Sequence, residues 1–150
     1  MKATFGAGCF WHVEDLLSKT KGVTSTAVGY IGGQLPNPTY EEVCSAQTGH
    51  AEAVEVEFNP DEITYEALLD IFWRNHNPTT LNRQGPDVVN QYRSAIFYHD
   101  EVQKEIAEKS KQSLDSSKSF NDPIVTQIIP APKFYKAEEY HQKYFKKQGF

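Results

Sequence analysis

The chain has 150 residues, of which 39% are hydrophobic, so it can enclose one full apolar core and is too short for two ordinary domains. Its 15 Lys and Arg against 20 Asp and Glu give a formal net charge of −5, which argues against a nucleic-acid partner. The 2 cysteines lie far apart and form no CxxC pair, which excludes a disulfide scaffold and a zinc site. Because no signal-peptide pattern or membrane-length apolar stretch is present, we expect a single cytoplasmic domain over 1–150, monomeric and without a membrane partner.

The first part of the chain predicts a strand, a helix and a second strand. Residues 3–7 are mostly apolar, and apolar side chains recur at helical spacing over 13–18. The dipeptide Lys21-Gly22 is typical of a helix end, and the alternating residues 23–30 predict the second strand. Cys9 therefore lies at the turn from the first strand into the helix.

A capping box predicts a short helical turn after a loop rich in Gly and Pro. Thr39 precedes Glu42 by three residues, the spacing at which each side chain can accept a hydrogen bond from the other residue's backbone N–H. The turn carries Tyr40 at its first position and Cys44 near its end. Tyr40 is thus expected at the rim of a loop.

The segment 52–58 alternates strictly, which predicts a strand with one apolar face. Val54 and Val56 lie on that face, and Glu52 has the same parity. A carboxyl that faces the core loses hydration, so its pKa rises and it can stay protonated near neutral pH as a general acid. The other interpretation is that Glu52 reaches solvent at the end of the strand.

The second half of the chain predicts the remaining elements. Residues 64–75 predict an amphipathic helix whose buried stripe consists of Ala67, Leu68, Ile71 and Phe72. The later elements are a strand at 94–98, a charged helix at 100–118, a strand at 124–129 and a helix at 138–147. This order predicts an α+β fold, with a ferredoxin-like split βαβ core and additional C-terminal helices and strand.

The position of Cys9 predicts a reactive thiol. The first amides of a helix carry the positive end of its dipole, which lowers a thiol pKa from about 8.5 toward roughly 3.5–7.5. Phe10 and Trp11 place two large rings beside the sulfur, as the lining of a pocket would. With an acid from the third strand and phenols from Tyr40 and Tyr92, the thiolate could attack an electrophile whose oxygen must leave. The alternative is a buried structural cysteine among core aromatics.

Several strings resemble the A-type peptide methionine sulfoxide reductases, and the resemblance spans nearly the whole chain. The strings are Gly8-Cys9-Phe10-Trp11, Gly49-His50-Ala51-Glu52-Ala53-Val54, the loop from Asn77-Pro78-Thr79 through Asn82-Arg83-Gln84-Gly85, Gln91-Tyr92-Arg93-Ser94 and Glu139-Tyr140-His141-Gln142. The resemblance implies an enzyme that reduces methionine-S-sulfoxide, free or in proteins, and so repairs oxidative damage.

The resemblance also implies the role of each site residue. Cys9 attacks the sulfoxide sulfur, Glu52 supplies the proton that makes the oxygen a leaving group, and a second thiol then reduces the Cys9 sulfenic acid. The residues that contact the substrate are Tyr40 and Tyr92, which hydrogen-bond the oxygen, Phe10 and Trp11, which hold the S-methyl group, and Asp87, which orients the substrate.

The sequence departs from the family pattern in two places. Members commonly carry resolving cysteines in a C-terminal tail, whereas no cysteine follows Cys44 in this sequence. Either Cys44 or an external reductant, such as thioredoxin, glutaredoxin or a small thiol, then reduces Cys9, and no bound cofactor is expected. We expect Cys44 to be a helix residue that does not contact Cys9. Pro86 and Val89 also differ from the family pattern around Asp87, which leaves the orientation of Asp87 open.

Two other functions remain open from the residues alone. A cysteine hydrolase would acylate Cys9 and use His50 or His141 as its base, and a histidine within hydrogen-bond reach of Cys9 would favour this reading. A non-catalytic binding domain would use the rings beside the thiol as an apolar pocket. His12 is expected on the helix surface, and because the histidines show no ligand spacing, we expect no metal.

Overall fold

The computed structural model describes residues 1–7, 10–33, 35–44, 49–76, 78–79, 93–117, 120 and 122–142, apart from the side chains of Phe10 and Cys44. The elements are β1 (Lys2–Gly6), α1 (Phe10–Ser18), β2 (Val23–Ile31), α2 (Tyr40–Cys44), β3 (Ala51–Phe58), α3 (Tyr65–Arg74), β4 (Ala95–Tyr98), α4 (Glu101–Ser116), β5 (Gln127–Pro130), β6 (Tyr135–Lys136) and the 3-10 helix η2 (Glu139–His141). In this part of the chain, no helix is long and apolar enough to cross a membrane.

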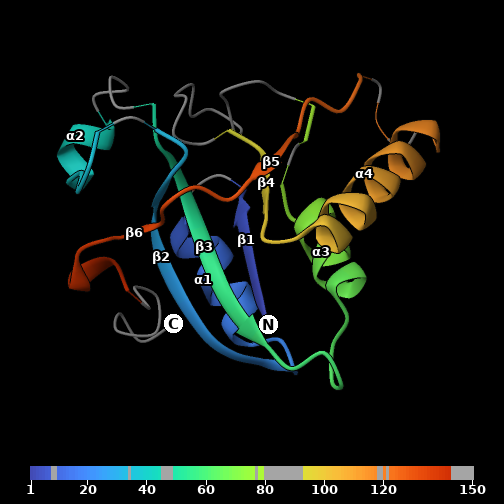
Figure 1. Cartoon of the computed structure of the whole chain (residues 1–150), viewed down its shortest axis with the longest axis horizontal. Coiled ribbons are helices and arrows are strands. Elements are labelled where there is room, and N and C mark those ends of the chain that lie inside the picture. The colour runs from blue at the N-terminus through green and yellow to red at the C-terminus, as the bar shows by residue number, and fades with distance from the viewer. Residues whose placement is uncertain are drawn as a thin grey trace.

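The described strands form one six-stranded sheet in the order β5-β4-β1-β3-β2-β6 (Figure 1). Strand β3 lies between β1 and β2 and is antiparallel to both, while β4 is antiparallel to β1. This is the split βαβ arrangement, so the predicted fold class is confirmed. Helix α4 leads into β5, which extends the sheet parallel to β4, and β6 pairs antiparallel with β2 at the opposite edge.

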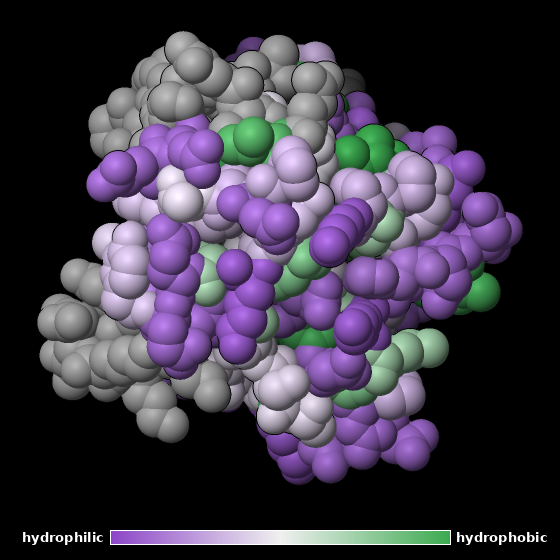
Figure 2. Space-filling model, turned by 60° about the vertical axis from the view of Figure 1, so that its left-hand side comes forward, coloured by the Kyte–Doolittle hydropathy of each residue, from purple (hydrophilic) through white to green (hydrophobic). Residues whose placement is uncertain are grey.

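The sheet is covered on both faces. Helix α1 lies against one face, and the chain between β5 and β6 crosses the other (Figure 1). The larger apolar cluster includes Phe5, Val28 and Val54 and packs against the helices, whereas the smaller one includes Phe97 and packs against Phe134. Figure 2 shows that the side carrying α2 and β6 presents a mostly hydrophilic surface. The buried side chains of β2 and β3 therefore lie between two layers of chain.

The buried face of α3 differs from the predicted stripe. Leu68 and Phe72 are buried as expected, but Ala67 and Ile71 are only half-buried. The other buried side chains of the helix are Tyr65, Leu69 and Trp73. Helix α4 packs beside α3, and the Trp73 indole donates a hydrogen bond to the Ser110 hydroxyl, 2.7 Å away. Packing against α4 thus buries further side chains of α3, which the spacing of apolar residues in the sequence of α3 does not reveal.

The C-terminal prediction was wrong in its details. The strand expected at 124–129 begins at Gln127, and β6, a strand of only two residues, was not predicted. Over the described residues 138–142, the helix expected at 138–147 shows only a single 3-10 turn, after which Gln142 has an extended backbone. Residues 143–147 of that predicted helix lie outside the described part. The side chain of Gln142 bonds to the backbone of Val28 in β2.

Candidate active site

Glu52 is the second residue of β3 and lies on the face of the sheet that carries the larger apolar cluster. The strand register sets it opposite Tyr30 of β2. Directly paired residues of antiparallel strands place their side chains on the same face as neighbours. Glu52 is only 1% exposed and Tyr30 is fully buried. The prediction that Glu52 points inward, rather than into solvent, is therefore confirmed.

The Glu138 carboxylate acts on the buried Tyr30 phenol. Burial raises the pKa of Tyr30, and the hydrogen bond and negative charge of Glu138 raise it further. The Tyr30 hydroxyl therefore stays protonated and donates a hydrogen bond to Glu138 Oε1, 2.9 Å away. Tyr30 was not singled out from the sequence, which placed it only at the end of the strand predicted at 23–30.

Tyr40 is positioned by the predicted capping box. The Glu42 amide donates to Thr39 Oγ1 over 3.2 Å, and the Thr39 amide donates to Glu42 Oε1 over 3.0 Å. These two bonds fix the start of α2, where Tyr40 is the first helical residue. The Tyr40 ring packs against His141, with 4.4 Å between the ring centroids.

Trp11 reaches the same histidine from α1. Its indole Nε1 donates a hydrogen bond to His141 Nδ1 over 3.0 Å. Burial lowers the pKa of His141, although Glu138 opposes this effect, so the ring is neutral. Because Nδ1 accepts the indole hydrogen, the ring proton resides on Nε2. His141 thus contacts both Trp11 and Tyr40, two residues that were predicted to contact the substrate.

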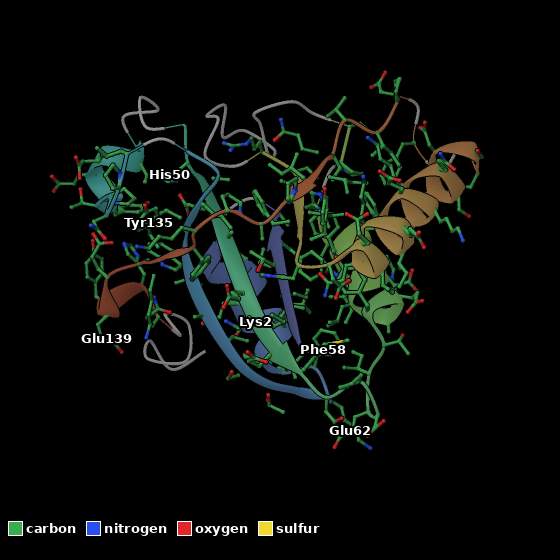
Figure 3. All side chains as sticks on the ribbon, viewed as in Figure 1. Lys2, His50, Phe58, Glu62, Tyr135 and Glu139 are labelled. Atoms are coloured by element: carbon green, nitrogen blue, oxygen red, sulfur yellow. The ribbon has the colours of Figure 1, made fainter. Side chains whose placement is uncertain are left out.

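Both ring nitrogens of His50 form hydrogen bonds with backbone groups, which does not suit the role of a hydrolase base. The Gly33 amide donates to His50 Nδ1 over 3.0 Å, and His50 Nε2 donates to the Leu35 carbonyl over 2.7 Å. The ring is buried and lies edge-on to Tyr135, and Figure 3 shows the two side chains near one another below α2. With both ring nitrogens bonded to the loop backbone, His50 anchors that loop.

The turn that carries His141 is fastened to the edge of β2. Gln142 Oε1 accepts from the Val28 amide, and Gln142 Nε2 donates to the carbonyls of Val28 and Ala137, each over 2.9 Å. The Ala137 amide also donates to the Val28 carbonyl. The side-chain amide therefore continues the edge pairing begun by β6, and it presents His141 to the rings of α1 and α2.

The structure describes three of the predicted site residues: Trp11 and Tyr40 both contact His141, whereas Glu52 lies opposite Tyr30 on the sheet. Cys9, Asp87 and Tyr92 lie outside the described residues, as do the side chains of Phe10 and Cys44. Strand β1 ends at Gly6 and α1 begins at Phe10, so the described elements flank the position of Cys9. His12 is exposed on α1, as predicted. Among the described residues, no group of three or more His, Cys, Asp or Glu side chains could hold a metal ion.

The sequence interpretation missed Glu138 and the structural role of His141 and Gln142. His141 was considered as a hydrolase base and as part of a recognised string, and Gln142 only as part of that string. Their partners in α1, β2 and α2 lie 98 to 130 residues away in the chain. The one available signal was the dense polar string from 138 to 142 after an apolar segment.

A family model described as peptide methionine sulfoxide reductase matches residues 1–149. The chain belongs to the peptide methionine sulfoxide reductase family. The peptide methionine sulfoxide reductase MsrA of Methanothermobacter thermautotrophicus is 62% identical over 146 residues, which cover 97% of this chain and 86% of that relative. The resemblance drawn from the sequence strings is therefore confirmed.

Solved structures agree with the family assignment. Mxr1 from Saccharomyces cerevisiae in reduced form has a TM-score of 0.92 at 37% identity, covering 99% of this chain and 86% of that chain. Mxr1 in complex with Trx2 has a TM-score of 0.67 at 27% identity, covering 96% and 84% respectively. Nothing in these matches supports the cysteine hydrolase or the non-catalytic binding domain.

Proposed function

We propose that the chain, as one catalytic domain, reduces methionine-S-sulfoxide, free or in proteins, to methionine and so repairs oxidative damage. The observation that carries this proposal is the burial of Glu52, which is 1% exposed and paired with Tyr30 on the apolar face of the sheet. A carboxyl in such surroundings can hold a proton near neutral pH and deliver it to an oxygen in a site that excludes water. Family membership supports the choice of sulfoxide as the substrate.

The chemical step transfers one oxygen atom. The Cys9 thiolate attacks the sulfoxide sulfur while Glu52 gives its proton to the sulfoxide oxygen. The attack joins the two sulfurs. The protonated oxygen then passes to the Cys9 sulfur as its bond to the substrate sulfur and the new sulfur–sulfur bond both break, so methionine leaves and Cys9 becomes a sulfenic acid. The methionine sulfur is reduced and the Cys9 sulfur is oxidised to the same extent, and Glu52 regains a proton from solvent.

The aromatic residues bind the reacting groups. The phenols of Tyr40 and Tyr92 donate hydrogen bonds to the sulfoxide oxygen, on which charge develops as the sulfur is attacked. The remaining contacts are to the S-methyl group, held by Phe10 and Trp11, and to the rest of the substrate, oriented by Asp87. The contacts of both Tyr40 and Trp11 with His141 support this arrangement, because neighbouring oxygen and methyl subsites require these two side chains to lie close together.

The oxidised enzyme is recycled by thiols. A first thiol condenses with the Cys9 sulfenic acid to give a disulfide and water, and a second thiol reduces that disulfide. We assign these thiols to an external reductant, and thioredoxin is the best-supported one because Mxr1 has been solved in complex with Trx2. Glutaredoxin, a small thiol or Cys44 are the other sources. A reducing compartment such as the cytoplasm suits this cycle.

Single-turnover mass spectrometry tests the proposal. The reduced protein is mixed with peptides that carry S- or R-methionine sulfoxide, without recycling thiol, and the oxidised cysteines are mapped. We expect methionine from the S epimer only, with a sulfenic acid at Cys9. A disulfide between Cys9 and Cys44 would make Cys44 the resolving cysteine. Absence of methionine from both epimers, with Cys9 still reduced, would overturn the proposed function.

A further inference from the structure

Glu138 lies immediately before η2 and joins two other elements through one carboxylate. Its Oε1 accepts a hydrogen bond from the Tyr30 hydroxyl of β2 over 2.9 Å. Its Oε2 accepts from the Tyr40 amide at the start of α2 over 3.0 Å. That amide belongs to the first turn of a helix, where no intrahelical acceptor is available. Glu138 supplies the missing acceptor from almost 100 residues along the chain.

The same turn also holds the Tyr40 ring. The His141 amide donates to the Glu138 carbonyl over 2.9 Å, which ties the two residues into one turn. The His141 ring then packs against the Tyr40 ring. Because Gln142 fastens this turn to Val28 of β2, its position is set by the sheet. This turn, which is fixed to the sheet, therefore contacts both the backbone and the ring of Tyr40.

Glu138 is ionised in this setting. Burial by itself would raise its pKa, but hydrogen bonds from the Tyr40 amide, its own amide and the Tyr30 hydroxyl outweigh burial, so the pKa of Glu138 is lowered. Hydrogen bonds to a charged acceptor are stronger than those between neutral groups. The anionic carboxylate is thus a firm anchor for both donors.

We infer that Glu138 is a positioning residue for sulfoxide reduction, whose carboxylate holds the Tyr40 amide and the Tyr30 hydroxyl together and thereby fixes the Tyr40 phenol at the sulfoxide oxygen. The inference rests on the proposed function, in which Tyr40 donates a hydrogen bond to that oxygen. Glu138 acts through Tyr40 and does not touch the substrate. A misplacement of a catalytic group by about 1 Å can slow a reaction about 100-fold.

Two conservative variants separate positioning from charge. In E138Q the amide oxygen can accept from the Tyr40 amide while the NH₂ group donates to the Tyr30 hydroxyl, so both links survive without the charge. E138D keeps the charge but is one methylene too short to reach both partners. We expect E138Q to keep the single-turnover rate within about 3-fold, and E138D and E138A to lose about 10-fold to 100-fold with little change in KM. If the negative charge rather than the two hydrogen bonds sustained the rate, E138D would react faster than E138Q. That result would overturn the inference.

A double variant tests whether Glu138 acts through Tyr40. In a Y40F background the phenol hydroxyl is gone, so adding E138A should slow the reaction by no more than about 2-fold. If the fold-losses in rate caused by Y40F and by E138A simply multiplied in the double variant, the two residues would act independently, which would contradict the inference. The matched control is E139A, since Glu139 is an exposed carboxylate on the same turn and lies at the outer edge of the molecule in Figure 3. E139A should retain the wild-type rate.

Hydrogen exchange of the Tyr40 amide gives a readout that does not depend on activity. We expect slow exchange in the wild type and E138Q, and exchange at least about 10-fold faster in E138D and E138A. If E138A does not fold, the comparison of E138D with E138Q carries the same test. Equal exchange in all variants would overturn the inference. A wild type that reduces neither epimer would instead overturn the proposed function, while the exchange rates would still decide whether Glu138 anchors Tyr40.

Discussion

A single carboxyl in an otherwise apolar strand face shows how local sequence determines chemistry. Strand side chains alternate between faces, so Glu52 shares the buried face with Val54, while Glu55 belongs to the opposite face. Glu55 accordingly forms an ion pair with Lys2, 3.4 Å away at the partly exposed side. Two glutamates three positions apart thus have opposite surroundings, and only the inner one has the buried setting that the proposed proton donor requires.

The first prediction concerns the proton donor itself. In E52Q an amide of nearly the same volume replaces the carboxyl, so sulfoxide binding should change little. The chemical step should slow by about 100-fold to 10,000-fold, because an amide is a poor proton donor. Single-turnover formation of methionine from an S-sulfoxide peptide measures this rate, with E55Q as the control on the other face of β3. An E52Q rate equal to that of the wild type would contradict the general-acid role.

The second prediction concerns a buried hydroxyl away from the site. The Tyr65 hydroxyl is buried, and no hydrogen-bond partner lies within reach in the described structure. Y65F should therefore leave the free energy of unfolding unchanged or raise it by up to about 1 kcal/mol, since it removes an unsatisfied polar atom. S110A should destabilise the protein by about 1–3 kcal/mol, because it leaves the buried Trp73 indole N–H without its hydrogen-bond acceptor. Urea unfolding of both variants checks the contrast, and a clear loss of stability in Y65F would contradict it.

At the scale of elements, the packing of strand β2 depends on a glycine. A Cβ at Gly29 would come within 2.5 Å of the Phe134 ring, which packs on that face of the sheet, and closer still to the Tyr135 carbonyl. G29A should therefore destabilise the protein by about 1–3 kcal/mol through overpacking. At Gly6 the nearest atom to an added Cβ is 3.2 Å away, so G6A should be the milder variant. Chemical denaturation of the two variants tests this order, and a G6A loss equal to that of G29A would argue against it.

Elements were predictable where the information is local. The capping box at Thr39 and the parity of Glu52 need only a few neighbouring residues, and both appear in the structure as expected. The strand β6 is too short for alternation to be visible, and the described start of the helix expected at 138–147 is a 3-10 turn followed by Gln142, whose side chain bonds to β2. The role of Glu138 depends on partners about 100 residues away, which no local pattern encodes.

At the scale of the whole molecule, a buried polar network joins three parts of the fold. His76 follows α3, and its Nδ1 donates to the Phe72 carbonyl over 2.6 Å. Its Nε2 therefore accepts from the Ser94 hydroxyl, also over 2.6 Å, and Ser94 in turn contacts the Thr126 hydroxyl at 2.7 Å. Ser94 precedes β4 and Thr126 precedes β5. The neutral imidazole thus links the end of α3 to the beginnings of two strands.

This network makes global stability depend on pH. Burial lowers the pKa of His76 from 6.5 to about 4, and the hydrogen bond to Phe72 opposes this only in part. Between these values His76 is protonated in the unfolded chain but neutral in the folded protein, so the unfolded state binds more protons and stability rises with pH. The contribution of His76 is complete above pH 6.5 and falls by about 3 kcal/mol as the pH drops toward 4.

The variant H76N isolates this contribution. An asparagine there can donate to the Phe72 carbonyl as Asn75 donates to the Ile71 carbonyl, over 2.7 Å, and it does not titrate. His99 and His141 also have lowered pKa values and contribute in the same direction, so the variant should keep a residual slope. We therefore expect the difference in unfolding free energy between wild type and H76N, measured in urea from pH 4 to 7, to increase with pH. A constant difference across this range would mean that His76 titrates alike in the folded and unfolded states, which burial among Phe72, Trp73 and Ser94 does not allow.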